Sequence, residues 1–274
     1  MATTPPVVSK RFIKAVPKFK RILARAKERD VNESDTVTIV TDMLEEIFGF
    51  DKYSEITREY SIQGTFCDLA IKTTKGVEYL IEVKAIGLTL NEGHLKQAVN
   101  YASREGIKWV VLTNGTTWHI HRVTLDEKVR QERLFSFDFS ELNPRLKEQQ
   151  ETLFLLCKRG VQKDLIDEYY EYRQSVNRYT VGTILLTDEV TNVVRRELRK
   201  MKTGIKVDNE EIKALLRSGI IKRDILESDA GKEALKQLTK VKRKEAKAKT
   251  KKVTKSSPSA NSPVSAGAGD QENE

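Results

Sequence analysis

Apolar and polar residues follow two periods along the chain, and these predict helices and strands in a definite order. Apolar residues at helical spacing predict helices over 17–29, 35–47 and 91–105. Alternating or continuous apolar runs predict strands over 54–60, 65–73, 77–85, 109–113 and 117–123. Pro17 stands at a suitable first helical position, Gly49 ends the second helix, and Asn114-Gly115 marks a tight turn.

This order of elements indicates an α/β domain. The helix between strands 77–85 and 109–113 provides the crossover that a parallel pair of strands needs. From about Asn143 the pattern becomes helical, and Asp208 and Gly219 bracket one short helix. We expect four segments, namely a basic N-terminal helix, the α/β domain, a helical region, and a tail that is first basic and then low-complexity and disordered: 1–30, 31–140, 141–238 and 239–274.

Composition places the chain among soluble proteins. Hydrophobic residues make up 38% of the 274 residues and charged residues 32%, and no apolar run has the length of a membrane span. Cys67 and Cys157 are too few for a disulfide framework, so a cytoplasmic protein is expected. Most of the net charge of +9 lies in residues 240–255, which could hold DNA non-specifically or serve as a solubilising tail.

Two neighbouring predicted strands carry charged residues among apolar ones. If residues 74–76 form a three-residue loop, the numbers of facing residues sum to 150, and Asp68 lies opposite Glu82. Lys84, two residues further along, points to the same face. The opposite face then carries a continuous apolar surface made of Cys67, Leu69, Ile71, Tyr79, Ile81 and Val83.

Two facing carboxylates repel each other strongly at low dielectric, and a divalent cation between them would remove the conflict. Oxygen ligands at this spacing suit Mg²⁺, and an ammonium beside them could orient water or stabilise charge on a phosphate. The alternative is a partly exposed hairpin with an ordinary ion pair, which contributes little. Phe66, Ala70 and Leu80 share the charged face and indicate that this face is covered.

The spacing of these residues resembles a known signature. Asp68 followed by Glu82-Val83-Lys84 is similar to the PD-(D/E)xK nuclease motif, without its Pro. NESDT at 32–36, QAVNYA at 97–102 and the TNG turn resemble the N-terminal nuclease domain of type I restriction enzyme R subunits, and the predicted type IV restriction endonucleases that share it. The resemblance covers residues 30–125 and, more loosely, the helices to about 230. It implies a restriction-endonuclease-like core, a mixed sheet flanked by helices, followed by a helical C-terminal region.

The resemblance also implies roles for matching positions. Asp68 and Glu82 would bind the metal, Mg²⁺ or alternatively Mn²⁺, together with the backbone carbonyl of Val83. Lys84 would be the cation that orients water or stabilises developing charge.

Three further site residues come from the same resemblance. Gln97 and Tyr101 match the family's QxxxY and would lie on one helix face beside the site. Glu33 matches the acid that often completes the metal shell, although Glu45 or Glu46 could reach the site instead.

The implied function is a Mg²⁺-dependent DNA endonuclease of restriction or defence type. Its partner would be double-stranded DNA, with no membrane association, and a homodimer could form through the helical region. The chain has no G-x-x-x-x-G-K-[ST] loop, so we expect an enzyme that stands alone, without an ATP motor. The alternative is a catalytically silent module on the same fold that binds DNA or a partner protein.

Other candidates are weaker. His119 and His121 share a strand face, but no third metal ligand is evident, which favours an ordinary strand surface. Trp109 and Trp118 are expected in the core or at its rim. His94 is expected to be exposed, and contact with substrate is the alternative.

Overall fold

The protein folds into two compact units, Met1–Tyr172 and Arg173–Glu274. The structure, a computed structural model, describes residues 3–62, 65–125, 128–202, 204 and 206–253. Among the described helices, none has the combination of length and apolar character that crossing a bilayer requires.

The first unit is built around a six-stranded sheet. The strands lie in chain order, and all neighbours are antiparallel except β3 and β4, which are parallel. This confirms the predicted crossover. The strands are β1 (Ile56–Ile62), β2 (Thr65–Thr73), β3 (Gly76–Val83), β4 (Trp109–Thr113), β5 (Thr117–Leu125) and β6 (Val129–Asp138). The helices are α1 (Pro6–Glu28), α2 (Glu33–Met43) with a π-helical turn (Leu44–Phe48), α3 (Lys96–Arg104) after a 3₁₀ turn (Glu92–Leu95), α4 (Lys147–Leu155), α5 (Lys158–Val161) and α6 (Leu165–Ser175).

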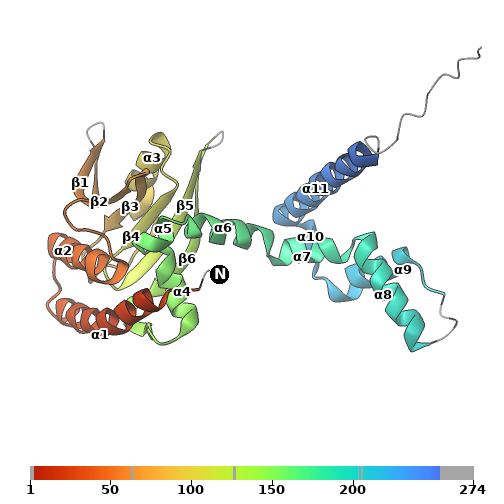
Figure 1. Ribbon diagram of the computed structural model, residues 1–274, viewed down its shortest axis with the longest axis horizontal. Coiled ribbons are helices and arrows are strands. Elements are labelled where there is room, and N and C mark those ends of the chain that lie inside the picture. Colours follow the sequence, from red (N-terminus) through yellow and green to blue (C-terminus); the bar gives the residue numbers. More distant parts are fainter. Residues whose placement is uncertain (1–2, 63–64, 126–127, 203, 205, 254–274) are drawn as a thin grey trace, which may run out of the picture. The chain divides into compact units, whose positions relative to one another are not determined.

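Helices cover both faces of this sheet (Figure 1). On one face, α1 and α2 pack against Leu69, Ile81 and Val111 in the larger hydrophobic cluster. On the other face, α3 packs against Leu80 and Val110 in a second cluster. The predicted α/β class, with a mixed sheet flanked by helices, is therefore confirmed.

Two elements differ from the prediction. The first helix begins at Pro6 rather than Pro17, because Pro6 occupies the favoured first helical position and Phe12 and Val16 already face the core. Pro17 lies inside the helix on its exposed side. Strand β6 was not predicted, since four of its first five residues are polar and the strand lies at the edge of the sheet.

The hairpin of β2 and β3 has the predicted register in the part that lies away from its turn. Leu69 faces Ile81 and Ala70 faces Leu80, so facing numbers sum to 150. The turn itself is shorter than predicted, because Thr73 pairs with Gly76, and a bulge after Ile71 restores the register.

Burial on the two hairpin faces follows the prediction in part. Ala70 and Leu80 are buried on the charged face, as expected, whereas Phe66 is 56% exposed. Leu69, Ile81 and their neighbours lie in the larger cluster, but Cys67 is buried in the second cluster, which corrects its predicted placement.

The second unit is helical. Its elements are α7 (Arg178–Leu185), α8 (Asp188–Met201), α9 (Asn209–Leu215) with a π-helical turn (Leu216–Ile220), α10 (Arg223–Glu227) and α11 (Asp229–Val253). Asp208 caps α9 by accepting a hydrogen bond from the backbone N–H of Glu211, as predicted. The basic stretch from Lys240 is helical through Val253, and the predicted low-complexity end lies outside the described residues.

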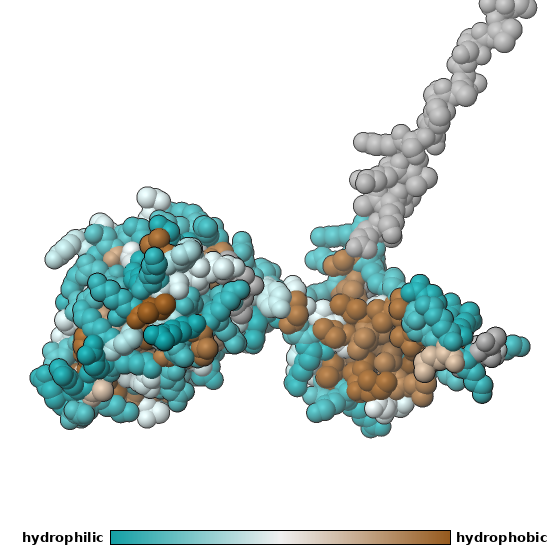
Figure 2. Space-filling model, turned by 60° about the horizontal axis from the view of Figure 1, so that its bottom comes forward, coloured by the Kyte–Doolittle hydropathy of each residue, from teal (hydrophilic) through white to brown (hydrophobic). Residues whose placement is uncertain are grey.

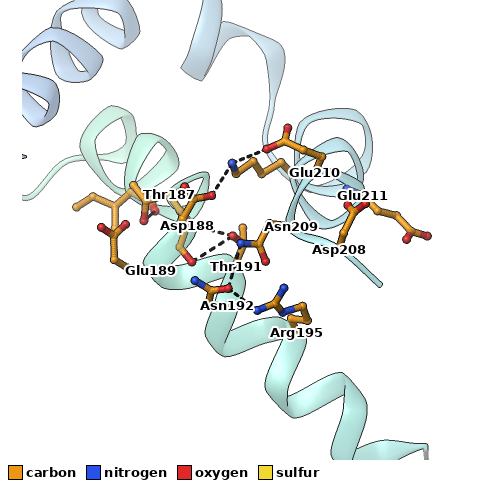
Figure 3. Close-up of polar contacts among 12 residues, drawn as sticks. Thr187, Asp188, Glu189, Thr191, Asn192, Arg195, Asp208, Asn209, Glu210 and Glu211 are labelled. Atoms are coloured by element: carbon orange, nitrogen blue, oxygen red, sulfur yellow. Dashed lines mark hydrogen bonds and ion pairs between the residues drawn. The ribbon is translucent and has the colours of Figure 1, made fainter. Parts of the chain in front are cut away.

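This second unit has little core of its own. Among its described residues, the hydrophobic side chains that are fully buried are Ile212, Ile221 and Ala234. Apolar side chains instead gather on one of its faces (Figure 2). Between α8 and α9 the contacts are polar: Lys213 pairs with Asp188 at 2.8 Å, and Asn209 bonds to Asn192 at 3.0 Å (Figure 3).

Candidate active site

Asp68 and Glu82 lie near the end of the β2–β3 hairpin, across from each other in the sheet. The adjacent pair of Leu69 and Ile81 sets this register, and period-2 alternation puts both acids on the face that α3 covers. The backbone N–H of Val83 donates a hydrogen bond of 2.7 Å to Asp68 Oδ2, which fixes the carboxylate against β3. The backbone of Val83 therefore lies next to the acids.

Lys84, the residue directly after β3, also contacts a third acid, Glu33. Its Nζ lies 2.8 Å from Glu82 Oε1 and 3.3 Å from both carboxylate oxygens of Glu33. Its side chain is only 16% exposed. Glu33 is the first residue of α2, and Asn32 holds that helix start by accepting a hydrogen bond from the N–H of Asp35.

The contacts favour Glu33 over the two alternatives for a place at this site. Glu46 pairs with Lys18 on α1 at 2.6 Å, and Glu45 is exposed on the π-helical turn that follows α2. A role of Glu33 as a metal ligand stays a prediction.

Burial and mutual repulsion destabilise the charged form of the acids. Burial, and then the charge of Asp68, raise the pKa of Glu82 to about 7, against the opposing effect of Lys84. Burial also raises the pKa of Asp68, although its hydrogen bond from Val83 opposes the shift. Burial tends to lower the pKa of Lys84, but the hydrogen bond and charge of Glu82 outweigh it, and the pKa is raised. Lys84 therefore stays positively charged at neutral pH, beside two acids whose charged forms are destabilised.

The donor atoms of this group fit a hard divalent cation. Asp68, Glu82 and Glu33 offer carboxylate oxygens, the ligands that Mg²⁺ and Mn²⁺ take in proteins. A cation among them would also relieve the repulsion that raises the pKa of Glu82. In the part of the chain that the structure describes, no group of three or more His, Cys, Asp or Glu side chains is arranged so that it could hold a metal ion. The ammonium of Lys84 now supplies the positive charge among the acids.

Gln97 and Tyr101, the two predicted residues of α3, lie in different surroundings. Gln97 Nε2 donates a 3.1 Å hydrogen bond to the carbonyl of Phe66, two residues before Asp68, so it borders the site. The Tyr101 hydroxyl donates to the carbonyl of Tyr60 on β1 at 3.0 Å, and the ring is buried in the second cluster. The observed contacts of Tyr101 thus tie α3 to the sheet.

One acid near the site escaped the sequence reasoning. The register of β1 with β2 places Glu59 across from Asp68, and its charge contributes to the raised pKa of Asp68. Glu59 adopts a φ of 45°, a backbone conformation uncommon for a non-glycine residue. The alternation of side chains along β1 could have identified Glu59 only if the pairing of β1 with β2 had been known.

The three histidines named as weaker candidates lie outside the acid group, and one of them is not where the sequence predicted. His121 is buried, which corrects its predicted place on a strand surface; burial lowers its pKa to about 4, so it is neutral. His119 is half-buried beside it. His94 takes part in a capping box with Asn91.

Trp109 and Trp118 are buried in the core, as predicted. Trp118 lies against Phe48 and Phe137, and Trp109 against Tyr170.

The first unit has a mixed sheet with helices on both faces, and two acids and a lysine lie at the end of one of its hairpins. This arrangement has the form of a restriction-endonuclease-like domain. Residues 39–134 match the family model of the type I restriction enzyme R protein N terminus (HSDR_N). This confirms the resemblance for that part of the chain, which includes Asp68, Glu82, Lys84 and Gln97 but not Glu33. The family indicates a nuclease or restriction function. No curated protein and no solved structure matches the chain significantly.

Proposed function

We propose that the protein is a Mg²⁺-dependent DNA endonuclease of restriction or defence type that cleaves double-stranded DNA without an ATP motor in this chain. The gathering of Asp68, Glu82, Glu33 and Lys84 is the observation that carries the proposal. The family matched by residues 39–134 also supports it, because that family is the N-terminal region of type I restriction enzyme R proteins.

In this proposal Asp68, Glu82 and Glu33 hold the ion, with the carbonyl of Val83 as a further oxygen donor. The bound ion would supply a more acidic water and positive charge for the phosphate oxygens. The same donor set would accept Mn²⁺.

The other groups of the site orient and stabilise the reacting atoms. Lys84 is a cation at neutral pH, so it holds the attacking water and stabilises negative charge as it develops on the phosphate. It is not suited to act as a base. Gln97, fixed to the backbone of β2, borders the site and would orient the DNA phosphate.

Cleavage of supercoiled plasmid DNA tests this function. We expect nicked and linear products with Mg²⁺ or Mn²⁺, and none with EDTA, Asp68→Ala or Lys84→Ala. Glu46→Gln is the matched control, because it removes an exposed acid that pairs with Lys18 and lies outside the group.

Activity that is the same with EDTA and in both alanine variants would refute the proposal. A protein that binds DNA but shows no cleavage and no stabilisation by Mn²⁺ would instead be the catalytically silent module.

A further inference from the structure

Helix α8 of the second unit exposes part of its apolar side to solvent, while Val190 and Leu198 are half-buried. The residue that it buries is Thr191. Val193 is 47% exposed and Met201 82% exposed, and Val194 is exposed beside them. A surface helix of a monomeric protein shows the reverse arrangement, with apolar residues inward and polar residues outward.

Helix α7 has the same inverted pattern. It buries Gly182 and Thr183, whereas Val181 and Ile184 are exposed. The glycine is required there, since a Cβ at Gly182 would lie 2.7 Å from the side chain of Ile225. Small residues thus allow close helix packing inside the unit, while Val181 and Ile184 remain outside.

The inner side of α8 is held by polar contacts. Asp188 pairs with Lys213, and Asn192 bonds to Asn209, both on the side that faces α9 (Figure 3). Because few of its described hydrophobic residues are fully buried, the described part of the unit has a smaller apolar core than a stable domain of its size normally has. A partner that covers the exposed face of α7 and α8 would bury further apolar surface of the unit.

The charges along α8 identify the occupant of this face. Glu189, Val193, Arg196 and Lys200 follow one another at helical spacing, so they form one edge of the apolar stripe. The first turn of α8 carries Asp188 and Glu189 and the last turn Arg199 and Lys200, with Arg195, Arg196 and Glu197 between them. Within one copy, Lys200 pairs with Glu197 and Glu189 with Lys242. Two copies of α8 packed antiparallel would place each acidic end against a basic end, whereas a partner of a single charge would leave one end unmatched.

We propose that the second unit is a dimerisation module in which the apolar face of α7 and α8 packs against the same face of a second copy of this chain. The two α8 helices run antiparallel about a two-fold axis, with Glu189 of each copy near Lys200 of the other. This inference does not depend on the proposed nuclease function. If both hold, the dimer carries two nuclease units.

Sedimentation velocity of the full chain at about 1–50 µM, a range suited to micromolar Kd values, tests the interface. We expect a dimer for the wild type. Val194→Glu should weaken dimerisation at least about 100-fold, since a charge then enters the apolar contact. Leu146→Glu, a substitution at an exposed position of the first unit, is the matched control and should remain dimeric. Far-ultraviolet circular dichroism should show the same helix content for all three proteins.

Charge exchange tests the second copy and its orientation. Glu189→Lys and Lys200→Glu should each weaken the dimer, and the double variant should restore it, because every interchain pair is then reversed together. Lys242→Ala removes the partner of Glu189 within the same copy and should leave the dimer intact. A monomeric wild type, or a Val194→Glu protein as dimeric as the wild type, would overturn the proposal. A double variant no better than the single ones would overturn the antiparallel arrangement.

Discussion

The substitution Glu82→Gln offers a direct thermodynamic test of the strained acid group. Glu82 is buried beside Asp68, and its pKa is about 7 in the folded protein, compared with an ordinary value of 4.5. Below pH 4.5 the group is protonated in both folded and unfolded chains, and its titration has no effect. Between 4.5 and 7 the unfolded chain releases a proton that the folded chain retains, so the free energy of unfolding falls as pH rises.

The size of this effect follows from the two pKa values. Each pKa unit corresponds to 1.36 kcal/mol, so the shift from 4.5 to about 7 costs the metal-free protein about 3 kcal/mol at pH 8. Glutamine has the shape of the protonated acid and carries no charge. Glu82→Gln should therefore raise the free energy of unfolding by up to about 3 kcal/mol at pH 8, and leave it nearly unchanged at pH 4.5.

Thermal unfolding in EDTA at pH 5 and pH 8 measures this difference. For a unit of this size, about 3 kcal/mol corresponds to roughly 6–12 °C in Tm. The gap between variant and wild type should open as pH rises, and Mg²⁺ should reduce it by stabilising the wild type alone. A variant that is less stable than the wild type at pH 8, or a gap that does not depend on pH, would refute the reasoning.

Three further substitutions test neighbouring contacts. Lys84→Met should abolish plasmid cleavage while binding of DNA fragments persists in a gel-shift assay, because the cation acts on the reacting phosphate; retained cleavage would contradict this. Asn32→Ala should lower the free energy of unfolding in urea by about 1 kcal/mol through loss of the α2 cap, and should slow cleavage by displacing Glu33. Gly49→Ala should lower the urea midpoint, since this residue has a φ of 81° and a Cβ there would meet Arg11 Nη1 at 2.1 Å; an unchanged midpoint would argue against this turn.

The geometry of the site hairpin could be predicted because two local rules act together. Side chains alternate strictly along a strand, and a short turn limits the register, so Asp68, Glu82 and Lys84 had to share a face once the hairpin was assumed. The actual turn is one residue shorter at its base, yet the bulge after Ile71 leaves the register near the site unchanged. The parallel pairing of β3 and β4 followed similarly from the helix between them.

What local patterns could not predict depends on contacts between distant segments, and Glu33 was expected at the site only from the family resemblance. The proximity of Glu33 to Lys84, and of Glu59 to Asp68, is set by how α2 and β1 pack on the hairpin, which no local pattern encodes. His121 looked like a strand-surface residue because alternation shows which residues share a face but not whether a helix covers it.

The apolar residues of α8 illustrate a limit of helical periodicity. Val190, Val193, Val194 and Leu198 follow a helical period in the sequence, which predicts a helix there. The structure buries Thr191 on the inner side, leaves Val193 and Val194 exposed, and half-buries Val190 and Leu198. Periodicity identifies an apolar face and leaves open whether the same chain or another one covers it.

Binding of Mn²⁺, followed by electron paramagnetic resonance of the free ion, tests the central claim that the acids at the end of the hairpin hold a divalent cation. The wild type should bind Mn²⁺ at pH 8, and Asp68→Asn and Glu82→Gln should each weaken binding by at least about 10-fold, while Glu46→Gln should bind like the wild type. Equal binding by all four proteins, or no binding by the wild type, would contradict the account.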